Sequence, residues 1–271
     1  MKSNLLHSFA DPGKPEHDFI SVVRAEGSTL WDATGKAYID AIASLWYCQV
    51  GHGRREIIEA VSNQMGSLAA YNTFDPFTNE PARRVAEMIA GRSPHPSGRV
   101  FLACSGSEAV DTALKLARLV MVRREEGERQ IVVKRARGYH GTNFGGTSAQ
   151  GIPANREGWG DLVPHFVEVP ADDVDAFRSV FEREGERIAA VLTEPVQGAG
   201  GVHPPPAGLL EELRRLCDAS GALLIFDEII TGYGRTGNMF AAQTFGVTPD
   251  LICAGKSLAS GVVPVGAMIM G

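Results

Sequence analysis

The chain has 271 residues, of which 44% are hydrophobic and 21% are charged. This apolar content is enough for one large core or two modest ones, and it predicts a soluble globular protein. The net charge of −6 and the scattered Lys and Arg residues argue against a nucleic-acid partner. The N-terminal segment lacks the apolar stretch of a signal peptide, and no apolar run approaches the roughly 20 residues of a membrane span. We therefore expect no membrane association and a cytoplasmic location.

The four cysteines stand at positions 48, 104, 217 and 253, without a CxxC pair among them. No group of Cys and His residues has the spacing of a zinc site. We expect reduced cysteines that lie in the core, and no metal.

The pattern of the first 50 residues differs from that of the rest. Short β-type runs at 21–24, 29–31 and 37–39 are separated by turn signals, which predicts a small antiparallel ribbon. From Arg54 onward, segments with helical periodicity alternate with apolar runs at 100–103, 131–133, 189–192, 222–226 and 251–253. Uniformly apolar strands between helices predict an α/β fold with a largely parallel sheet that is covered on both faces.

In such sheets a ligand binds beyond the carboxyl ends of the strands. Each apolar run is followed by residues suited to that place: Ser105-Gly106-Ser107-Glu108, Gly138-Tyr139-His140-Gly141, Glu194-Pro195-Val196-Gln197-Gly198, Asp227-Glu228 and Gly255-Lys256. These segments are the candidates for a site.

The first of these segments precedes an amphipathic helix that we expect from Glu108 to about Arg124. Free backbone N–H groups at a helix N-terminus, next to small residues such as Gly106 and Ser107, would suit a phosphate. Ser105 and Glu108 also fit the S-x-x-E pattern of an ordinary capping box. Both interpretations stay open on this motif alone.

Asp227 and Lys256 end two apolar runs. A partly desolvated carboxylate at position 227 needs a cationic partner, which a protonated pyridine nitrogen would supply, although it could instead cap a neighbouring loop. An amine at position 256 could attack a cofactor aldehyde and later carry a proton, although an isolated lysine is usually surface charge. Tyr139 offers a ring face for stacking, or covers the core; His140 is equally well explained as a hydrogen-bonded loop residue.

Together these segments resemble the class III aminotransferases of pyridoxal-5′-phosphate (PLP) fold type I. The resemblance rests on residues 105–109 (SGSEA), 138–141 (GYHG), 194–198 (EPVQG), 227–237 (DEIITGYGRTG), 255–256 (GK) and 264–267 (PVGA), in the order and spacing of the family. It implies a mostly parallel sheet flanked by helices. Residues 1–53 would be the antiparallel N-terminal segment of a small domain, and residues 54–271 the PLP-binding large domain.

The resemblance also implies the roles of individual residues. Gly106 and Ser107 would bind the cofactor phosphate, and Asp227 would hold the pyridine nitrogen. Lys256 would carry the aldimine. Tyr139 and Ile229 would lie on opposite faces of the ring, and Glu194 matches a family glutamate close to the active site.

Two aromatic segments, residues 44–47 (SLWY) and 71–74 (YNTF), resemble the branch that uses ω-amino acids or amines with pyruvate, in which aromatic residues such as Trp46 line the substrate pocket. Ala199 stands where ornithine- and GABA-type relatives tend to carry a glutamate, which argues against those branches. We expect an amine or ω-amino acid donor and a keto acid acceptor such as pyruvate.

Several alternatives remain at this stage. Residues 198–201 (GAGG) also resemble the diaminopelargonate branch. An aminomutase or racemase could use the same scaffold. The family implies a homodimer and a longer C-terminal part, so we expect the chain to stop short of that part, and an inactive PLP-binding remnant is a further possibility.

Overall fold

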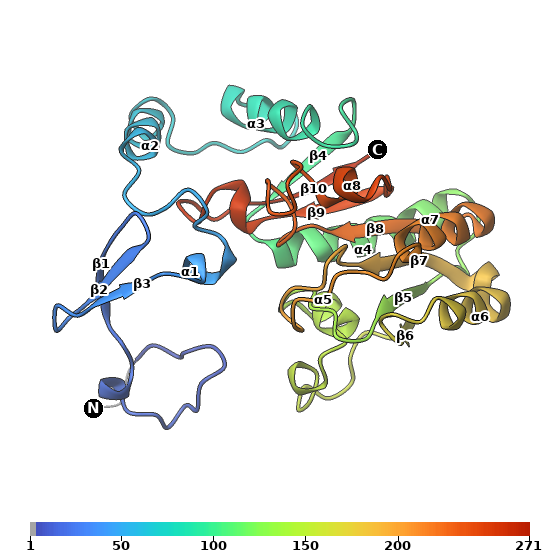
Figure 1. The fold of residues 1–271 in the computed structure, drawn as a ribbon. Helices are drawn as coiled ribbons and strands as arrows, with labels where there is room; N and C mark the ends of the chain where they lie inside the picture. Colours follow the sequence, from blue (N-terminus) through green and yellow to red (C-terminus); the bar gives the residue numbers. More distant parts are fainter. Residues whose placement is uncertain (1–3) are drawn as a thin grey trace. The chain divides into compact units, whose positions relative to one another are not determined.

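The computed structural model describes residues 4–271 and contains two compact units, Met1–Ala70 and Tyr71–Gly271 (Figure 1). The boundary predicted between residues 1–53 and 54–271 falls inside the first of these units. It was inferred from the family resemblance and stays a prediction. No helix among residues 4–271 has both the length and the apolar character needed to cross a membrane.

The first unit is built on a three-stranded antiparallel sheet in the order β1-β2-β3, with strands Val22–Glu26, Thr29–Asp32 and Ala37–Ile39. The carboxylate of Asp32 accepts the backbone N–H groups of Thr34 and Lys36, which closes the β2–β3 turn. The predicted ribbon is therefore confirmed. The unit also contains η1 (Glu16–Asp18), α1 (Ala43–Trp46) and α2 (Arg55–Ser67).

The second unit is a seven-stranded sheet in the order β4-β10-β9-β8-β7-β5-β6. Strand β10 runs opposite to the other six strands, so the predicted mostly parallel sheet is confirmed. The strands are β4 (Arg99–Ala103), β5 (Ile131–Arg135), β6 (Phe166–Val169), β7 (Ile188–Thr193), β8 (Leu223–Asp227), β9 (Leu251–Ala254) and β10 (Gly266–Met270).

Helix α3 (Glu80–Ala90) precedes the first strand of the sheet, and the other helices lie in the connections between its strands, as expected for parallel neighbours. These other helices are α4 (Gly106–Arg123), α5 (Phe144–Ala149), α6 (Val174–Glu184), α7 (Leu209–Ser220) and α8 (Ala241–Phe245), with short 3-10 turns η2 (Pro153–Asn155), η3 (Gly185–Arg187) and η4 (Lys256–Leu258). The helix expected from Glu108 is α4, which begins two residues earlier.

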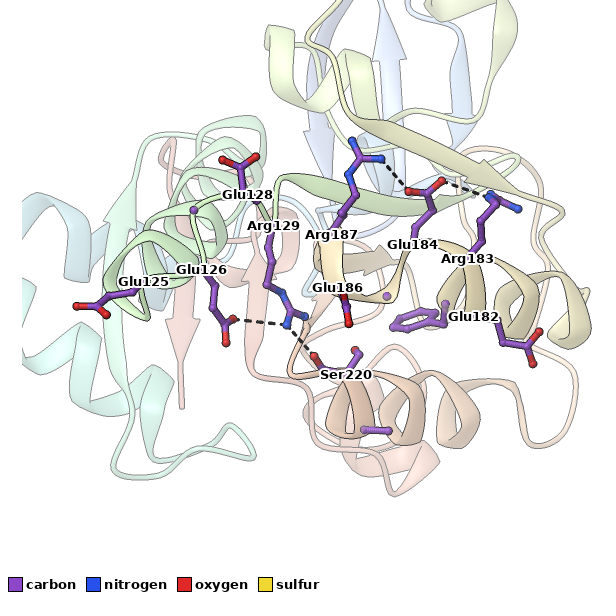
Figure 2. Close-up of a pocket in the computed structure, with 14 residues that line it drawn as sticks. Glu125, Glu126, Glu128, Arg129, Glu182, Arg183, Glu184, Glu186, Arg187 and Ser220 are labelled. Carbon is purple, nitrogen blue, oxygen red and sulfur yellow. Dashed lines mark hydrogen bonds and ion pairs between the residues drawn. The ribbon is translucent and has the colours of Figure 1, made fainter.

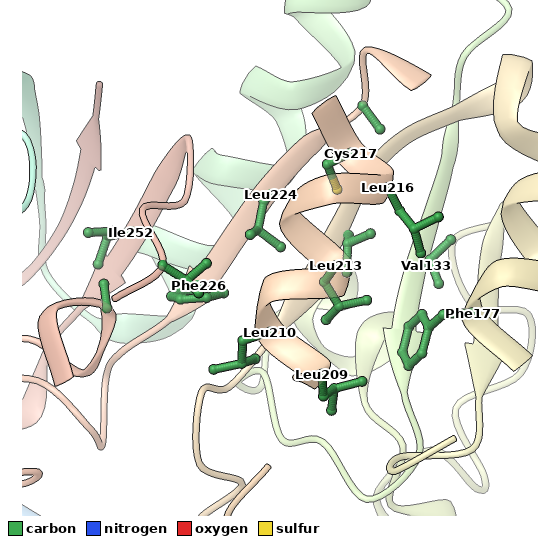
Figure 3. Close-up of a cluster of buried hydrophobic side chains, with 14 of the residues drawn as sticks. Val133, Phe177, Leu209, Leu210, Leu213, Leu216, Cys217, Leu224, Phe226 and Ile252 are labelled. Atoms are coloured by element: carbon green, nitrogen blue, oxygen red, sulfur yellow. The ribbon is translucent and has the colours of Figure 1, made fainter. Parts of the chain in front are cut away.

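Two hydrophobic clusters cover the two faces of the sheet. On one face Phe177 of α6 and Leu213 of α7 pack in a cluster with alternate strand residues such as Leu224 and Phe226 of β8 (Figure 3). On the other face the apolar stripe of α4 packs against the intervening strand residues. The strands are thereby held rigidly, and the loops at their carboxyl ends start from fixed positions.

Candidate functional site

A cavity of about 140 Å³ lies at the carboxyl ends of the parallel strands. The loops that follow β4, β5, β7, β8 and β9 all contribute to it, as the strand-end pattern predicted. Its lining consists of Gly106, Ser107, Tyr139, Gly141, Glu194, Asp227, Ile229, Ile230 and Lys256. The structure thus brings together seven of the eight predicted site residues.

Asp227, the last residue of β8, presents a buried carboxylate to this cavity. Its Oδ2 lies 2.9 Å from Nδ1 of His140, and its Oδ1 accepts the backbone N–H of Ile229 at 3.2 Å. His140 is also buried, so the pair is shielded from water. No distinct role was predicted for His140, because nothing in the sequence shows that its ring turns toward Asp227.

Glu194 links two of the loops that line the cavity. One carboxylate oxygen accepts the backbone N–H of Tyr139, and the other accepts that of Gly198, both at 2.9 Å. Burial raises the pKa of this carboxyl, and the nearby carboxylate of Asp227 acts in the same direction. Glu194 therefore fixes the backbone from which the Tyr139 side chain extends.

Lys256 follows β9 and lines the cavity with its side chain partly buried. Burial lowers the pKa of its amine, while the carboxylates of Asp227 and Glu194 oppose that effect. Its φ of 44° lies in the left-handed region, which is uncommon for a residue with a Cβ. Such strained positions are often found at functional sites.

The start of α4 forms one wall of the cavity. Ser105 caps the helix, since its Oγ accepts the N–H of Glu108 at 3.1 Å, and the Glu108 carboxylate accepts the N–H of Cys104 at 2.9 Å. Ser105 is therefore the N-cap, but the bond from Glu108 reaches the residue before the cap, so only the Ser105 half of the predicted capping box is present. A Cβ at position 106 would lie 2.7 Å from Cδ1 of Ile229, so glycine lets that side chain lie close to the start of the helix.

Ser107 connects the start of α4 to the loop after β5. Its Oγ accepts the N–H of Thr142 at 3.1 Å. Gly141, with φ of 98°, also approaches it, and a Cβ there would lie 2.6 Å from the same oxygen. Gly141 and Ile230 line the cavity but were not predicted as site residues, although both stand inside motifs that the sequence displays.

Trp46, the remaining predicted residue, belongs to the first compact unit, in the irregular segment α1. Its backbone has φ of 62°. Its contact with a substrate stays a prediction.

A larger hollow of about 770 Å³ lies at the opposite end of the strands, where β5, β7 and β8 begin (Figure 2). Its lining is mainly charged, and several of its side chains pair with one another: Glu184 pairs with Arg183 and Arg187, and Arg129 with Glu126. The hollow lacks the buried acid and amine of the strand-end cavity. Within residues 4–271, no group of three or more His, Cys, Asp or Glu side chains is arranged to hold a metal.

Comparison with known proteins shows that the chain belongs to the class-III aminotransferase family. The sequence model of the class-III aminotransferases matches residues 11–271. A β-alanine–pyruvate aminotransferase of Pseudomonas aeruginosa is 39% identical over 92% of this chain, and an acetylornithine aminotransferase of Methanopyrus kandleri is 40% identical over 92%. The chain spans 59% and 61% of the lengths of these two relatives.

The fold has close counterparts among solved structures. An amine transaminase from an uncultivated Pseudomonas species, determined in its PLP-bound form, superposes with a TM-score of 0.93 at 32% identity. That similarity covers the whole of this chain and 66% of the other.

Proposed function

Because the chain belongs to the class-III aminotransferase family, we propose that it binds PLP and carries the reacting residues of a transaminase. The reaction would move an amino group from an amine or ω-amino acid to a keto acid such as pyruvate. One observation carries the proposal: the carboxylate of Asp227 and the amine of Lys256 line one cavity, from the ends of two adjacent strands.

The residues of the cavity fit PLP in their chemistry. A carboxylate has about four lone-pair sites, and the two known contacts of Asp227 leave acceptor capacity for a protonated ring nitrogen. The buried His140 orients that carboxylate. When bound, PLP supplies an electron sink for a carbanion at the substrate carbon.

The phosphate would bind at the N-terminus of α4, where Gly106 and Ser107 present backbone N–H groups near the positive end of the helix dipole. We assign the ring faces to Tyr139 and Ile229, which both line the cavity. Glu194 would hold Tyr139 in place through its backbone N–H.

Lys256 would attach the cofactor through Nζ and then move the proton at the reacting carbon. The lowered pKa of its amine favours the neutral form that both tasks need. Lys134 is more deeply buried than Lys256, but its Nζ donates to the carbonyl of Gln150 and to the carboxylate of Glu168. Those contacts hold Lys134 in an ion pair, so it is a poor nucleophile.

The choice of donor depends on the relatives and on position 199. The Pseudomonas aeruginosa relative is named for β-alanine and pyruvate, whereas an equally similar relative is named for acetylornithine. Position 199 lies in the loop after β7 and is an alanine, which offers no charge to a donor's second amine. We therefore favour an amine or ω-amino acid as the donor. Such a donor would not need a carboxylate at position 199 to bind a second amino group.

We further propose that the protein works as a homodimer in the cytoplasm. The support for association is a set of large apolar side chains that are exposed in the single chain, among them Phe74, Phe101 and Phe144. The support for a reducing compartment is that none of the four cysteines, all within the described part of the chain, forms a disulfide.

The first test is where the cofactor attaches. The protein is incubated with PLP, reduced with borohydride, and mapped by peptide mass spectrometry. We expect the pyridoxyl group on Lys256 and on no other lysine. Lys256→Ala should lose this labelling and alanine formation from β-alanine and pyruvate, while Lys115→Ala, on the exposed side of α4, should retain both.

Labelling of Lys134 in place of Lys256 would refute the assignment. A racemase or mutase would label the same lysine, so the product separates these reactions: a transaminase converts pyruvate to alanine in proportion to the donor consumed. Turnover of a single substrate without a keto acid would contradict transamination.

A further inference from the structure

Three side chains of the first compact unit form a relay that the proposed transaminase chemistry does not use. Sγ of Cys48 lies 3.5 Å from Nδ1 of His52, and Nε2 of His52 lies 2.8 Å from Oδ2 of Asp40. A thiol, an imidazole and a carboxylate are thus connected in that order. This is the arrangement by which an acid orients a histidine and the histidine activates a nucleophile.

The acid end of the relay is fixed by the backbone. The Asp40 side chain is 3% exposed, and its two oxygens accept the N–H of Ser44 at 2.9 and 2.8 Å. The hydrogen bond to His52 is the main cause that lowers the pKa of Asp40, so this carboxyl is ionised at neutral pH. An ionised Asp40 favours the tautomer of His52 with its proton on Nε2, which leaves Nδ1 as an acceptor facing the thiol.

The histidine is also held through its own backbone. His52 and Gly27 exchange two hydrogen bonds, of 3.0 and 2.8 Å, which join the loop after α1 to the β1–β2 turn. The imidazole therefore has a fixed position between Asp40 and Cys48. A base must be positioned in this way to act on one particular thiol.

We propose that Cys48 is a nucleophilic thiol, activated by His52 and Asp40, that undergoes exchange with low-molecular-weight disulfides. His52 Nδ1 takes the thiol proton as Sγ attacks one sulfur of the disulfide. A bond forms between Sγ and that sulfur, the original S–S bond breaks, and the other half leaves as a thiolate that takes up the proton. The two electrons that the cysteine gives up are taken by the disulfide, so no other oxidant is required.

The other three cysteines lack these features and serve as references within the same molecule. Cys217 and Cys253 are buried, and burial raises the pKa of both thiols, to about 12 for Cys217. Cys104 is exposed, whereas Cys48 is only partly exposed. Exposure alone therefore predicts that Cys104 reacts first, and activation by His52 predicts that Cys48 does.

The experiment follows all four cysteines of the intact chain at pH 7 with glutathione disulfide as the probe. Reaction is stopped by acid at intervals, and peptide mass spectrometry gives the mixed disulfide at each position. We expect Cys48 to react at least about tenfold faster than Cys104, since general-base assistance typically contributes more than that. Faster reaction at Cys104 than at Cys48 would overturn the proposal, and this comparison needs no variant.

Two variants then assign the effect to the relay. His52→Gln should slow Cys48 by about tenfold or more and leave the rate at Cys104 unchanged. His17→Gln removes an exposed histidine of the same unit and should change neither rate. An unchanged rate at Cys48 in His52→Gln would show that the imidazole contact is structural only.

Discussion

Two adjacent acids, Asp227 and Glu228, serve different purposes because β8 ends between them. Asp227 is the last strand residue and faces the cavity. Glu228 points to the other side, where its carboxylate accepts the N–H groups of Ala241 and Ala242 at the start of α8 and the hydroxyl of Thr231. Glu228 therefore links the beginning of the loop 228–240 to the helix that follows the loop.

The second acid makes stability depend on pH. Burial raises the pKa of Glu228 to about 7 from a usual value of 4.5. The folded state thus binds this proton more tightly than the unfolded state, so the contribution of Glu228 to stability is greatest below pH 4.5 and falls as pH rises toward 7.

We therefore expect the difference in free energy of unfolding between the wild type and Glu228→Gln to change with pH. The wild type should lose up to about 3 kcal/mol relative to the variant between pH 5 and 8. Urea unfolding at several pH values measures this difference. Glu182→Gln, on an exposed position of α6, should follow the wild type throughout, and a constant difference for Glu228→Gln would contradict the expectation.

At the residue scale, the sequence predicted which residues meet in the strand-end cavity better than it predicted the contacts that hold them there. Glycine, serine, aspartate and lysine at strand ends could be found because strand ends are visible as the limits of apolar runs. The contacts of His140 with Asp227 and of Glu194 with Tyr139 join residues far apart in the chain. No local pattern encodes them, because they depend on how neighbouring loops pack.

At the scale of elements, the N-terminus of α4 combines stability and the proposed binding of phosphate. The Ser105 cap satisfies one of the free N–H groups of the helix. Ser105→Ala should cost about 1 kcal/mol in the free energy of unfolding. It should also weaken PLP binding, because the first turn, which includes Gly106 and Ser107, is less well fixed.

The matched control is the cap of α6, where the carboxylate of Asp173 accepts the N–H of Ala176 at 2.9 Å. Asp173→Ala should lower stability by a similar amount, about 1 kcal/mol, without an effect on PLP. Chemical denaturation measures the first quantity and fluorescence titration with PLP the second. Equal loss of PLP affinity in the two variants would show that general stability, and not the α4 terminus, governs binding.

Strand β6 shows where prediction of elements failed. It was not among the predicted apolar runs, because Glu168 interrupts a four-residue strand and two of its other residues are only partly buried. Edge strands need less apolar character than central ones, so their sequences resemble loops. The central strands β5, β7, β8 and β9 are buried throughout, and all four were predicted.

At the scale of the whole molecule, the first compact unit lacks a core of its own. None of residues 4–70 is buried, and its exposed large apolar side chains include Leu5, Leu6, Phe9, Ile39, Ile58 and Met65. Such surface is normally covered in an assembly. We expect the protein to be dimeric at micromolar concentration by size-exclusion chromatography with light scattering, and a monomer at every concentration would contradict the proposed association.

The order of strands also sets an order of assembly during synthesis. Strand β4 stands at one edge of the sheet, and its sole strand neighbour is β10, which pairs Arg99 with Met270 and Ala103 with Gly266. Strands β5 to β9 can pair with one another as they leave the ribosome, whereas β4 must wait until residues 266–270 emerge. Through that interval the edge of β9 is unpaired and open to non-native pairing. Completion of the sheet is therefore a late, long-range event, because β4 joins the sheet only when β10 inserts between β4 and β9.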